Sequence, residues 1–194
     1  MKKSNGRNKI NIAVFISGKG SNLKNLIKYS LKKNSKYTIS LIISNNFKAK
    51  GLEYSRKFKI EKKIFNYKSV KSSEKIIIKK LKSRNIKIIC LAGFMKILSR
   101  SFIKKFNNKI INIHPSLLPK YKGLNTHEKA IRNKDKYSGC TVHYVNSQLD
   151  SGKIIMQKKV KILKSDNSHT LSKRILKQEH IIYPKALASV LSSL

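Results

Sequence analysis

The feature that most constrains the fold of this 194-residue chain is the alternation of continuous apolar runs with amphipathic stretches. The first run, Ile10–Ile16, ends in Ser-Gly-Lys-Gly, and Ser21 then opens a stretch whose apolar residues recur at helical spacing. Continuous apolar runs are typical of strands that are buried on both faces of a sheet. The alternation therefore predicts an α/β fold with a mostly parallel central sheet flanked by helices.

The remaining elements follow from the same periodicity. We expect further strands at residues 37–43, 63–65, 86–92, 109–113, 140–146 and 154–160. We expect helices at residues 48–58, 72–83, 99–106 and 126–132, the last capped by Thr126. A closing helix should run from Ser168 or Thr170 toward Leu191 and bend or restart at Pro184. No linker or repeat interrupts the pattern, so residues 1–194 are predicted to form one domain.

Composition narrows the class of protein. Apolar residues make up 40% of the chain, and no apolar run approaches the length of a membrane span. The basic N-terminus leads into the first strand rather than into the apolar region of a signal peptide. Cys90 and Cys140 stand far apart without metal-ligand spacing, as expected in a reducing compartment. We therefore expect a cytoplasmic globular protein that does not associate with membranes.

The formal net charge of +37 has two interpretations. A charge of this size suits binding to nucleic acid or to a membrane surface. It also arises from compositional drift, because Lys, Ile and Asn, which are abundant here, have AT-rich codons. Only six of the 45 basic residues are Arg, and the lysines are spread along the whole chain. Nucleic-acid sites concentrate their charge and favour Arg, so we favour drift and expect no specific nucleic-acid partner.

The eight acidic residues leave few candidates for acid–base chemistry. Five lie among lysines in expected helices or loops and are interpreted as solvated charges: Glu53, Glu61, Glu74, Glu128 and Asp135. The other three are Asp150, Asp166 and Glu179. Asp150 follows an expected strand and precedes Gly152. Catalytic residues and ordinary turn aspartates both occupy such positions, and the spacing alone favours neither.

Two polar segments follow expected strands, at the edge where α/β sheets bind their ligands. The glycine-rich turn at residues 17–22 either directs backbone N–H groups and a helix dipole at an anion or is simply a tight turn. Asn112 and His114 share one face of a strand end, where an amide and an imidazole can stabilise a developing oxyanion. A single histidine is more often structural, and no histidine spacing here indicates a metal site.

Five segments of the chain form a recognisable set of motifs. The segment NIHPSLLPKYKG at residues 112–123 is similar to the signature of the folate-dependent formyltransferases. The segments ISGKGSNL, LAGFMKILS, GCTVHYVNSQLDSGKIIMQ and QEHIIYP begin at residues 16, 91, 139 and 178. They narrow the resemblance to the phosphoribosylglycinamide formyltransferases of purine synthesis. The resemblance extends from Ile10 to about Pro184.

The resemblance implies a Rossmann-like formyltransferase fold. Its N-terminal half would bind glycinamide ribonucleotide, and its C-terminal half would contribute a folate cleft. The implied reaction moves a formyl group from 10-formyltetrahydrofolate to the amine of N1-(5-phospho-ribosyl)glycinamide, without a metal. Matched motif by motif, the implied catalytic residues are Asn112, His114 and Asp150; the ribonucleotide site comprises Gly20, Ser21, Asn22 and Glu179; and the pterin pocket comprises Met95, Lys96, Ile97, Leu98 and Asn112.

The chemistry of these residues agrees with the implied roles. His114, as imidazolium, and the Asn112 amide would donate hydrogen bonds to the developing oxyanion. Asp150 would raise the pKa of His114 and help to move the amine proton. The chain also departs from the family pattern, because Lys122 replaces a usual proline and Asn125 a common histidine. The LDGGP-like turn reads LDSGK, and the usual arginine before the third helix is missing near Lys71 and Ser73.

Other readings stay open. Methionyl-tRNA formyltransferase shares the HPSLLP segment, and formyltetrahydrofolate hydrolase is a second relative. Each carries an additional domain, for which this chain is expected to have no room. A lysine-rich nucleic-acid binder and a relative without activity are alternatives from other classes, against which the intact Asn112, His114 and Asp150 argue. We expect small-molecule substrates and a monomer or weak homodimer.

Overall fold

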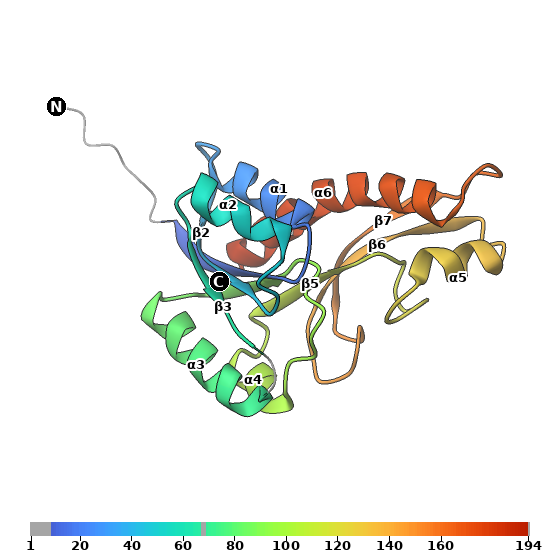
Figure 1. Cartoon of the computed structure of the whole chain (residues 1–194). Coiled ribbons are helices and arrows are strands. Elements are labelled where there is room, and N and C mark those ends of the chain that lie inside the picture. Colours follow the sequence, from blue (N-terminus) through green and yellow to red (C-terminus); the bar gives the residue numbers. More distant parts are fainter. Residues whose placement is uncertain (1–8, 67–68, 194) are drawn as a thin grey trace.

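The computed structural model describes residues 9–66 and 69–193, which form one seven-stranded sheet with helices on both faces (Figure 1). The strand order is β3-β2-β1-β4-β5-β6-β7. Neighbouring strands from β3 to β5 pair in parallel, whereas β5–β6 and β6–β7 pair antiparallel. The strands are β1 (Ile10–Ile16), β2 (Tyr37–Ser44), β3 (Glu61–Ile64), β4 (Ile88–Leu91), β5 (Ile110–His114), β6 (Tyr137–Tyr144) and β7 (Ile154–Lys161). The predicted α/β fold with a mostly parallel sheet is confirmed.

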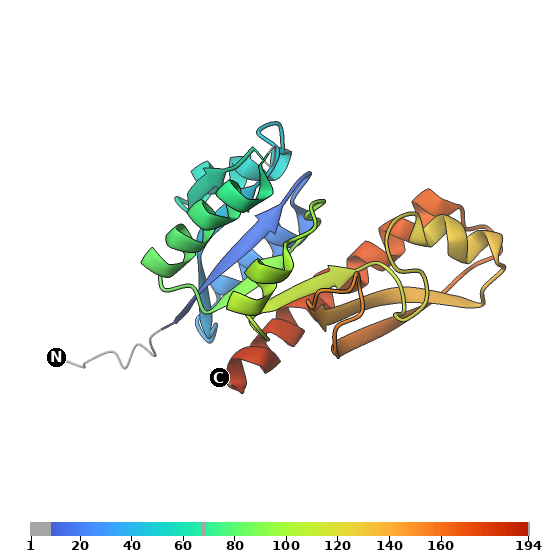
Figure 2. The same ribbon diagram turned by 90° about the horizontal axis from the view of Figure 1, so that it is seen from below.

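The apolar run of β1 supplies both faces of the sheet with core residues. Ile12, Val14 and Ile16 pack into one buried cluster, and Ala13 and Phe15 pack into the other. The first cluster includes side chains of α1 (Ser21–Ser30) and α6 (Ser168–Ser192); the second includes side chains of α3 (Val70–Ser83) and α4 (Arg100–Lys105). Figures 1 and 2 show these two pairs of helices on opposite sides of the sheet. A strand covered on both faces needs an unbroken apolar sequence, which is why β1 was recognisable.

Several expected boundaries are wrong. Residues 48–58 form a short 3-10 helix, Lys50–Leu52, followed by α2 (Glu53–Lys57), instead of one helix. Strand β3 begins at Glu61, two residues before the expected start, because its pairing with β2 begins there. The helix α5 (Thr126–Arg132) is preceded by Asn125 at the cap position. Thr126 does not cap this helix, since its hydroxyl donates to the Pro115 carbonyl.

The closing helix α6 runs unbroken through Pro184, so the expected restart there is wrong. A proline inside a helix leaves the carbonyl four residues earlier without its usual N–H donor. That carbonyl belongs to His180, and it accepts a hydrogen bond from the side-chain amide of Asn25 on α1. The neighbouring helix thus satisfies the group that Pro184 leaves free, and the helix continues.

The order of the strands reverses direction at β1, which pairs with β2 on one side and with β4 on the other. In open α/β sheets, ligands bind at such a switch point, outside the carboxyl ends of the strands. The connections after β1, β4 and β5 leave the sheet at this edge, and the β6–β7 connection lines the same cleft.

Candidate active site

A cleft of about 1020 Å³ lies at this edge of the sheet. Its walls come from three connections that are far apart in sequence, β4–α4, β5–α5 and β6–β7, together with residues of α1, α4, α5 and α6. Most of the predicted site residues line it: Asn22, Met95, Lys96, Ile97, Leu98, Asn112, His114, Asp150 and Glu179. Gly20 and Ser21 are not among the lining residues, but they lead directly into Asn22 at the start of α1.

His114 and Asp150 meet in this cleft, as the motifs indicated. His114 is the last residue of β5 and is 5% exposed. Its Nδ1 lies 3.4 Å from Oδ2 of Asp150, and its Nε2 lies 2.9 Å from the Tyr121 carbonyl oxygen. Asp150 has a left-handed backbone (φ 47°), and the N–H of Gly123 donates to its Oδ2 at 2.9 Å. The carboxylate is therefore aimed at the imidazole by a backbone contact from a different loop.

Asn112 faces a second histidine that sequence reasoning missed. Asn112 of β5 and His143 of β6 are partners in the antiparallel register. The amide nitrogen of Asn112 lies 3.2 Å from Nε2 of His143, and that Nε2 lies 3.6 Å from Oδ1 of Asp150. His143 lies inside the segment that resembles the family, but only the strand pairing places it opposite Asn112.

His114 and His143 carry their protons on different ring nitrogens. A carbonyl oxygen only accepts, so a ring nitrogen bonded to it carries the proton. His143 donates from Nδ1 to the Tyr144 carbonyl at 2.8 Å, which leaves Nε2 to accept from Asn112. His114 donates from Nε2 to the Tyr121 carbonyl, which leaves Nδ1 facing Asp150. Nearby residues thus specify which nitrogen of each ring faces the other polar groups of the cleft.

Burial is the main influence on the pKa of His114. It lowers this pKa below its ordinary value, and the Tyr121 carbonyl and the Asp150 carboxylate oppose the shift without reversing it. Asp150 thus acts in the expected direction, but the net shift is opposite to the one expected. For Asp150 itself burial raises the pKa, yet the contacts with His143, the Gly123 N–H and His114 outweigh it and leave the pKa lowered. Asp150 is therefore a carboxylate at neutral pH.

The predicted ribonucleotide residues also converge. Gly20 precedes α1 with a left-handed backbone (φ 70°), and a Cβ there would lie 2.7 Å from the Cα of Gly51. Asn22 donates to Oε2 of Glu179 on α6 at 2.7 Å, across 157 residues of sequence. Burial raises the pKa of Glu179, against the bond from Asn22. The turn and the last helix thereby form one end of the cleft.

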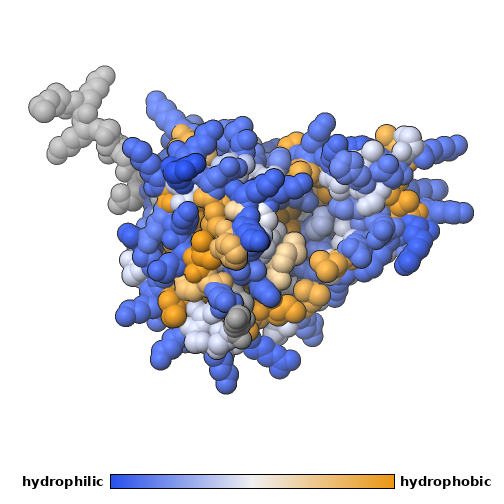
Figure 3. Space-filling view, viewed as in Figure 1, coloured by the Kyte–Doolittle hydropathy of each residue, from blue (hydrophilic) through white to orange (hydrophobic). Residues whose placement is uncertain are grey.

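The β4–α4 connection carries the predicted pterin-binding residues. Met95 and Ile97 are 65% and 78% exposed, whereas Leu98 is buried in the core. The Met95 N–H donates to the Ser17 hydroxyl at 2.7 Å, so this connection is bonded to the β1–α1 turn. Across the cleft, Leu124 and Leu149 are also exposed. Figure 3 shows apolar side chains gathered in the middle of this face with hydrophilic ones around them, a surface suited to a flat ring system.

Glu74 is not a solvated charge, and the expectation is corrected here. It is 3% exposed, its Oε1 accepts from the Ser99 N–H at 2.8 Å, and its Oε2 accepts from the Ser99 hydroxyl. Ser99 in turn caps α4 by accepting from the Phe102 N–H. The signal was available, since residues 74, 77 and 81 share the buried face of α3. Glu74 therefore anchors the end of the β4–α4 connection.

Two departures from the family pattern contact each other. Lys122 donates from Nζ to the Ser151 hydroxyl at 2.6 Å. The bond joins the loop that contains Gly123 to the loop that contains Asp150, next to the contact between those two residues. Lysine and serine here add a polar link between two loops of the site.

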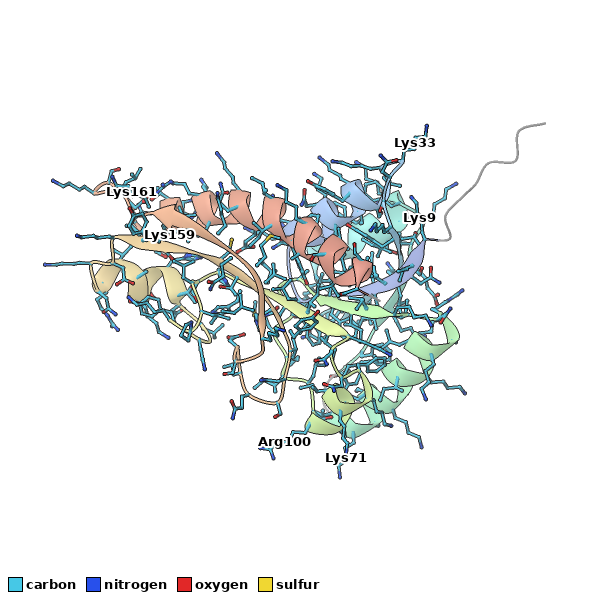
Figure 4. All side chains as sticks on the ribbon, turned by 180° about the vertical axis from the view of Figure 1, so that it is seen from behind. Lys9, Lys33, Lys71, Arg100, Lys159 and Lys161 are labelled. Carbon is cyan, nitrogen blue, oxygen red and sulfur yellow. The ribbon has the colours of Figure 1, made fainter. Side chains whose placement is uncertain are left out.

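The basic side chains do not gather at one place. Figure 4 shows Lys9 and Lys33, Lys71 and Arg100, and Lys159 and Lys161 at three separate corners of the molecule. No helix within the described ranges is both long and apolar enough to cross a membrane. Among the same residues there is no cluster of three or more His, Cys, Asp or Glu side chains with the geometry of a metal site.

Comparison with known proteins identifies the family of the chain. The family model described as formyl transferase matches residues 10–187. The phosphoribosylglycinamide formyltransferase of Escherichia coli K12 is 37% identical over 182 residues, which cover 92% of this chain and 86% of that protein. The crystal structure of phosphoribosylglycinamide formyltransferase from Anaplasma phagocytophilum superposes with a TM-score of 0.91 at 41% identity, covering 95% of this chain and 87% of that one.

A longer relative matches as well. The human trifunctional purine biosynthetic protein adenosine-3 is 42% identical over 189 residues, which cover 96% of this chain. The chain spans only 19% of the length of that relative. The match to the family model and the likeness to the bacterial enzymes nevertheless extend over nearly the whole chain. The chain therefore belongs to the formyl transferase family and, within it, to the phosphoribosylglycinamide formyltransferases.

Proposed function

We propose that this chain transfers a formyl group from 10-formyltetrahydrofolate to the amine of N1-(5-phospho-ribosyl)glycinamide. The products would be the N-formyl ribonucleotide and tetrahydrofolate, as a step of de novo purine (IMP) biosynthesis. The observation that carries the proposal is the meeting of His114 and Asp150 at 3.4 Å in a large cleft that Asn112 also lines. Those side chains are the ones that acyl transfer to an amine requires.

In this mechanism the amine nitrogen bonds to the formyl carbon while the bond from that carbon to N10 of the folate breaks. Asn112 donates to the formyl oxygen, on which negative charge develops. His114 donates to the same oxygen from Nδ1 in its imidazolium form, because the neutral ring holds its only proton on Nε2. That charge favours the imidazolium and so opposes the effect of burial on His114. Asp150, held as a carboxylate, accepts the proton that the amine loses, directly or through water. N10 takes up a proton as it leaves.

The ends of the cleft suit the two substrates. The first N–H groups of α1, at Gly20, Ser21 and Asn22, would hold the phosphate, and Glu179 would contact the ribonucleotide. At the other end, the segment Met95 to Leu98 would hold the pterin together with Asn112. Support comes from the exposed Met95 and Ile97 side chains there.

We also propose a setting for the reaction. The substrates are small molecules, no metal takes part, and the protein acts in the cytoplasm as a monomer or weak homodimer. The +37 charge adds no specific nucleic-acid partner. Support comes from the dispersed positions of the labelled basic side chains in Figure 4.

The decisive experiment incubates the purified chain with 10-formyltetrahydrofolate and the ribonucleotide. We expect formation of tetrahydrofolate by absorbance and of the N-formyl product by mass spectrometry, each dependent on both substrates. Initiator methionyl-tRNA, offered in place of the ribonucleotide, should not be formylated. Formylation of the tRNA alone, or release of formate without an acceptor, would assign a different reaction to the site.

A further inference from the structure

The carbonyl that orients His114 belongs to a residue with an unusual backbone. Tyr121 has a left-handed conformation (φ 55°), which bulky residues seldom adopt. Its carbonyl oxygen lies 2.9 Å from Nε2 of His114. Such a conformation persists only where the surroundings hold it, so the contacts of the Tyr121 side chain matter for His114.

The Tyr121 phenol is held from both sides at the end of α5. Its hydroxyl donates to Oδ2 of Asp135 at 2.8 Å and accepts from the side-chain amide of Asn133 at 2.9 Å. The Asp135 N–H donates to the carbonyl of Ala130, which is fully buried on α5. The Asp135 side chain is only 16% exposed. The phenol is thus anchored to a fixed part of the molecule, and Asp135 is not the solvated charge that its sequence context suggested.

These contacts form a continuous path from Asp135 through the ring and backbone of Tyr121 to one nitrogen of His114. We propose that Asp135 and Tyr121 are positioning residues that keep the proton of neutral His114 on Nε2, so that Nδ1 is the nitrogen presented to Asp150 and to the substrates. Neither residue lines the cleft, so neither touches a substrate. The inference rests on the proposed formyl transfer for its kinetic consequence, but the position of the proton is a property of the free protein.

Two substitutions test the path with little change of shape. Tyr121→Phe removes the phenol oxygen alone, and Asp135→Asn replaces the charged acceptor by an amide. Lys120→Met is the matched control, because Lys120 pairs with Oδ1 of the same Asp135 at 3.2 Å and is 65% exposed. That control removes a neighbouring ion pair while leaving the phenol bond intact. Asp135→Glu retains a carboxylate and should restore part of what Asp135→Asn loses.

The first readout is nitrogen NMR of His114, which distinguishes the two neutral tautomers. In the wild-type protein we expect the proton on Nε2, and in Tyr121→Phe and Asp135→Asn we expect a mixture of both forms. We expect kcat to fall by roughly 10-fold to 10²-fold, as for misplaced catalytic groups, while KM for the ribonucleotide changes little. The control should match the wild type in both measurements.

The second readout is the pH profile of kcat. The charged and titratable groups around His114 are Asp150, His143 and His127, and none of the substitutions alters them. The Tyr121 carbonyl raises the pKa of His114, so loosening it lowers that pKa. If the imidazolium is required, the loss of activity at high pH then begins at a lower pH in both variants. If the contacts of Tyr121 are only structural, the variants should lose thermal stability, and the pH at which kcat falls on the alkaline side should not change.

The outcomes are separable. A wild-type His114 with its neutral proton on Nδ1 overturns the inference whether or not the variants fold. Folded variants with unchanged tautomer, kcat and pH limb overturn it too, and so does failure of both variants to fold, which would make the contact a folding element. Absence of formyl transfer by the wild type would instead contradict the proposed function, and the NMR result would still decide the inference.

Discussion

The two ends of the cleft are built in different ways. At the end proposed to bind the ribonucleotide, the β1–α1 turn follows a buried strand and offers mainly backbone groups, with Gly20 as its one left-handed residue. At the catalytic end, side chains from β5, β6 and two irregular loops meet, and Tyr121, Asn125 and Asp150 all have left-handed backbones without being glycine. Residues in sparsely populated backbone conformations occur at catalytic sites, although Lys59, Asn85, Asn108 and Lys134, which lie outside this cleft, also have positive φ.

This difference between the two ends predicts that replacing single side chains at the catalytic end lowers activity strongly and affects folding little. His114→Ala should leave the protein folded and lower kcat by about 10²–10³-fold, the usual cost of losing an oxyanion donor. Steady-state kinetics and circular dichroism test this, with His169→Ala, an exposed position on α6, as the control. Retention of more than about half of the wild-type activity would remove His114 from the mechanism.

Asp150→Asn should produce the next largest effect, because it keeps the shape of the turn but removes the proton acceptor. Asp150 raises the pKa of His114, so the variant should lower that pKa and shift the high-pH loss of activity toward lower pH. We expect kcat to fall by about 10²-fold, whereas calorimetry should show nearly unchanged binding of the ribonucleotide, whose proposed phosphate site lies at the opposite end. A joint collapse of turnover and affinity would make Asp150 a structural turn residue.

Sequence periodicity predicted the strands and helices but not most of the contacts between the loops of the catalytic end, for physical reasons. The face of a strand or helix is readable from sequence because its side chains repeat with a fixed period. The pairing of Asn112 with His143 depends on strand register across the long connection, residues 115–136, between two neighbouring antiparallel strands, and no local pattern encodes that register. The family resemblance named Asp150 and Glu179, since motifs report residues whose contacts are too distant for local rules.

Glu74 is the exception, because helical spacing predicts that it is buried, whereas its lysine-rich surroundings suggest a solvated charge. Surrounding lysines suggested a solvated charge, although helical spacing placed the residue with Ile77 and Leu81 on the buried face. Because lysine is so frequent, most acidic residues have basic neighbours in the sequence, which suggests a solvated surface charge whether or not the side chain is buried. In a chain with a net charge of +37, burial patterns are therefore better guides to the role of a carboxylate than the charges of its neighbours.

Glu74 also offers a test at the folate end. Glu74→Gln keeps the length of the side chain but weakens its two bonds to Ser99, which ends the segment that begins at Met95. We expect KM for the formyl donor to rise by roughly 3-fold to 10-fold, in line with about 1 kcal/mol for the net contribution of a typical hydrogen bond. KM for the ribonucleotide should not change. The control is Glu53→Gln, an exposed carboxylate on α2; equal effects of both variants would indicate a general loss of charge.

The smallest effect is expected from Lys122, which links the two loops of the catalytic end from outside. Lys122→Ala removes the bond to the Ser151 hydroxyl but leaves the Gly123 N–H donating to Asp150. Exposed polar links contribute little because water competes for both partners, so we expect less than about a 2-fold change in kcat/KM. Ser151→Ala removes the same bond from the other loop and should behave alike, and the double variant should be no worse than either.

A loss of 10-fold or more in kcat/KM shared by all three variants would show instead that the Asp150 carboxylate depends on this outer link. The backbone contact from Gly123 would then be too weak to hold the carboxylate alone, and the catalytic end would owe its geometry to the two residues that depart from the family pattern.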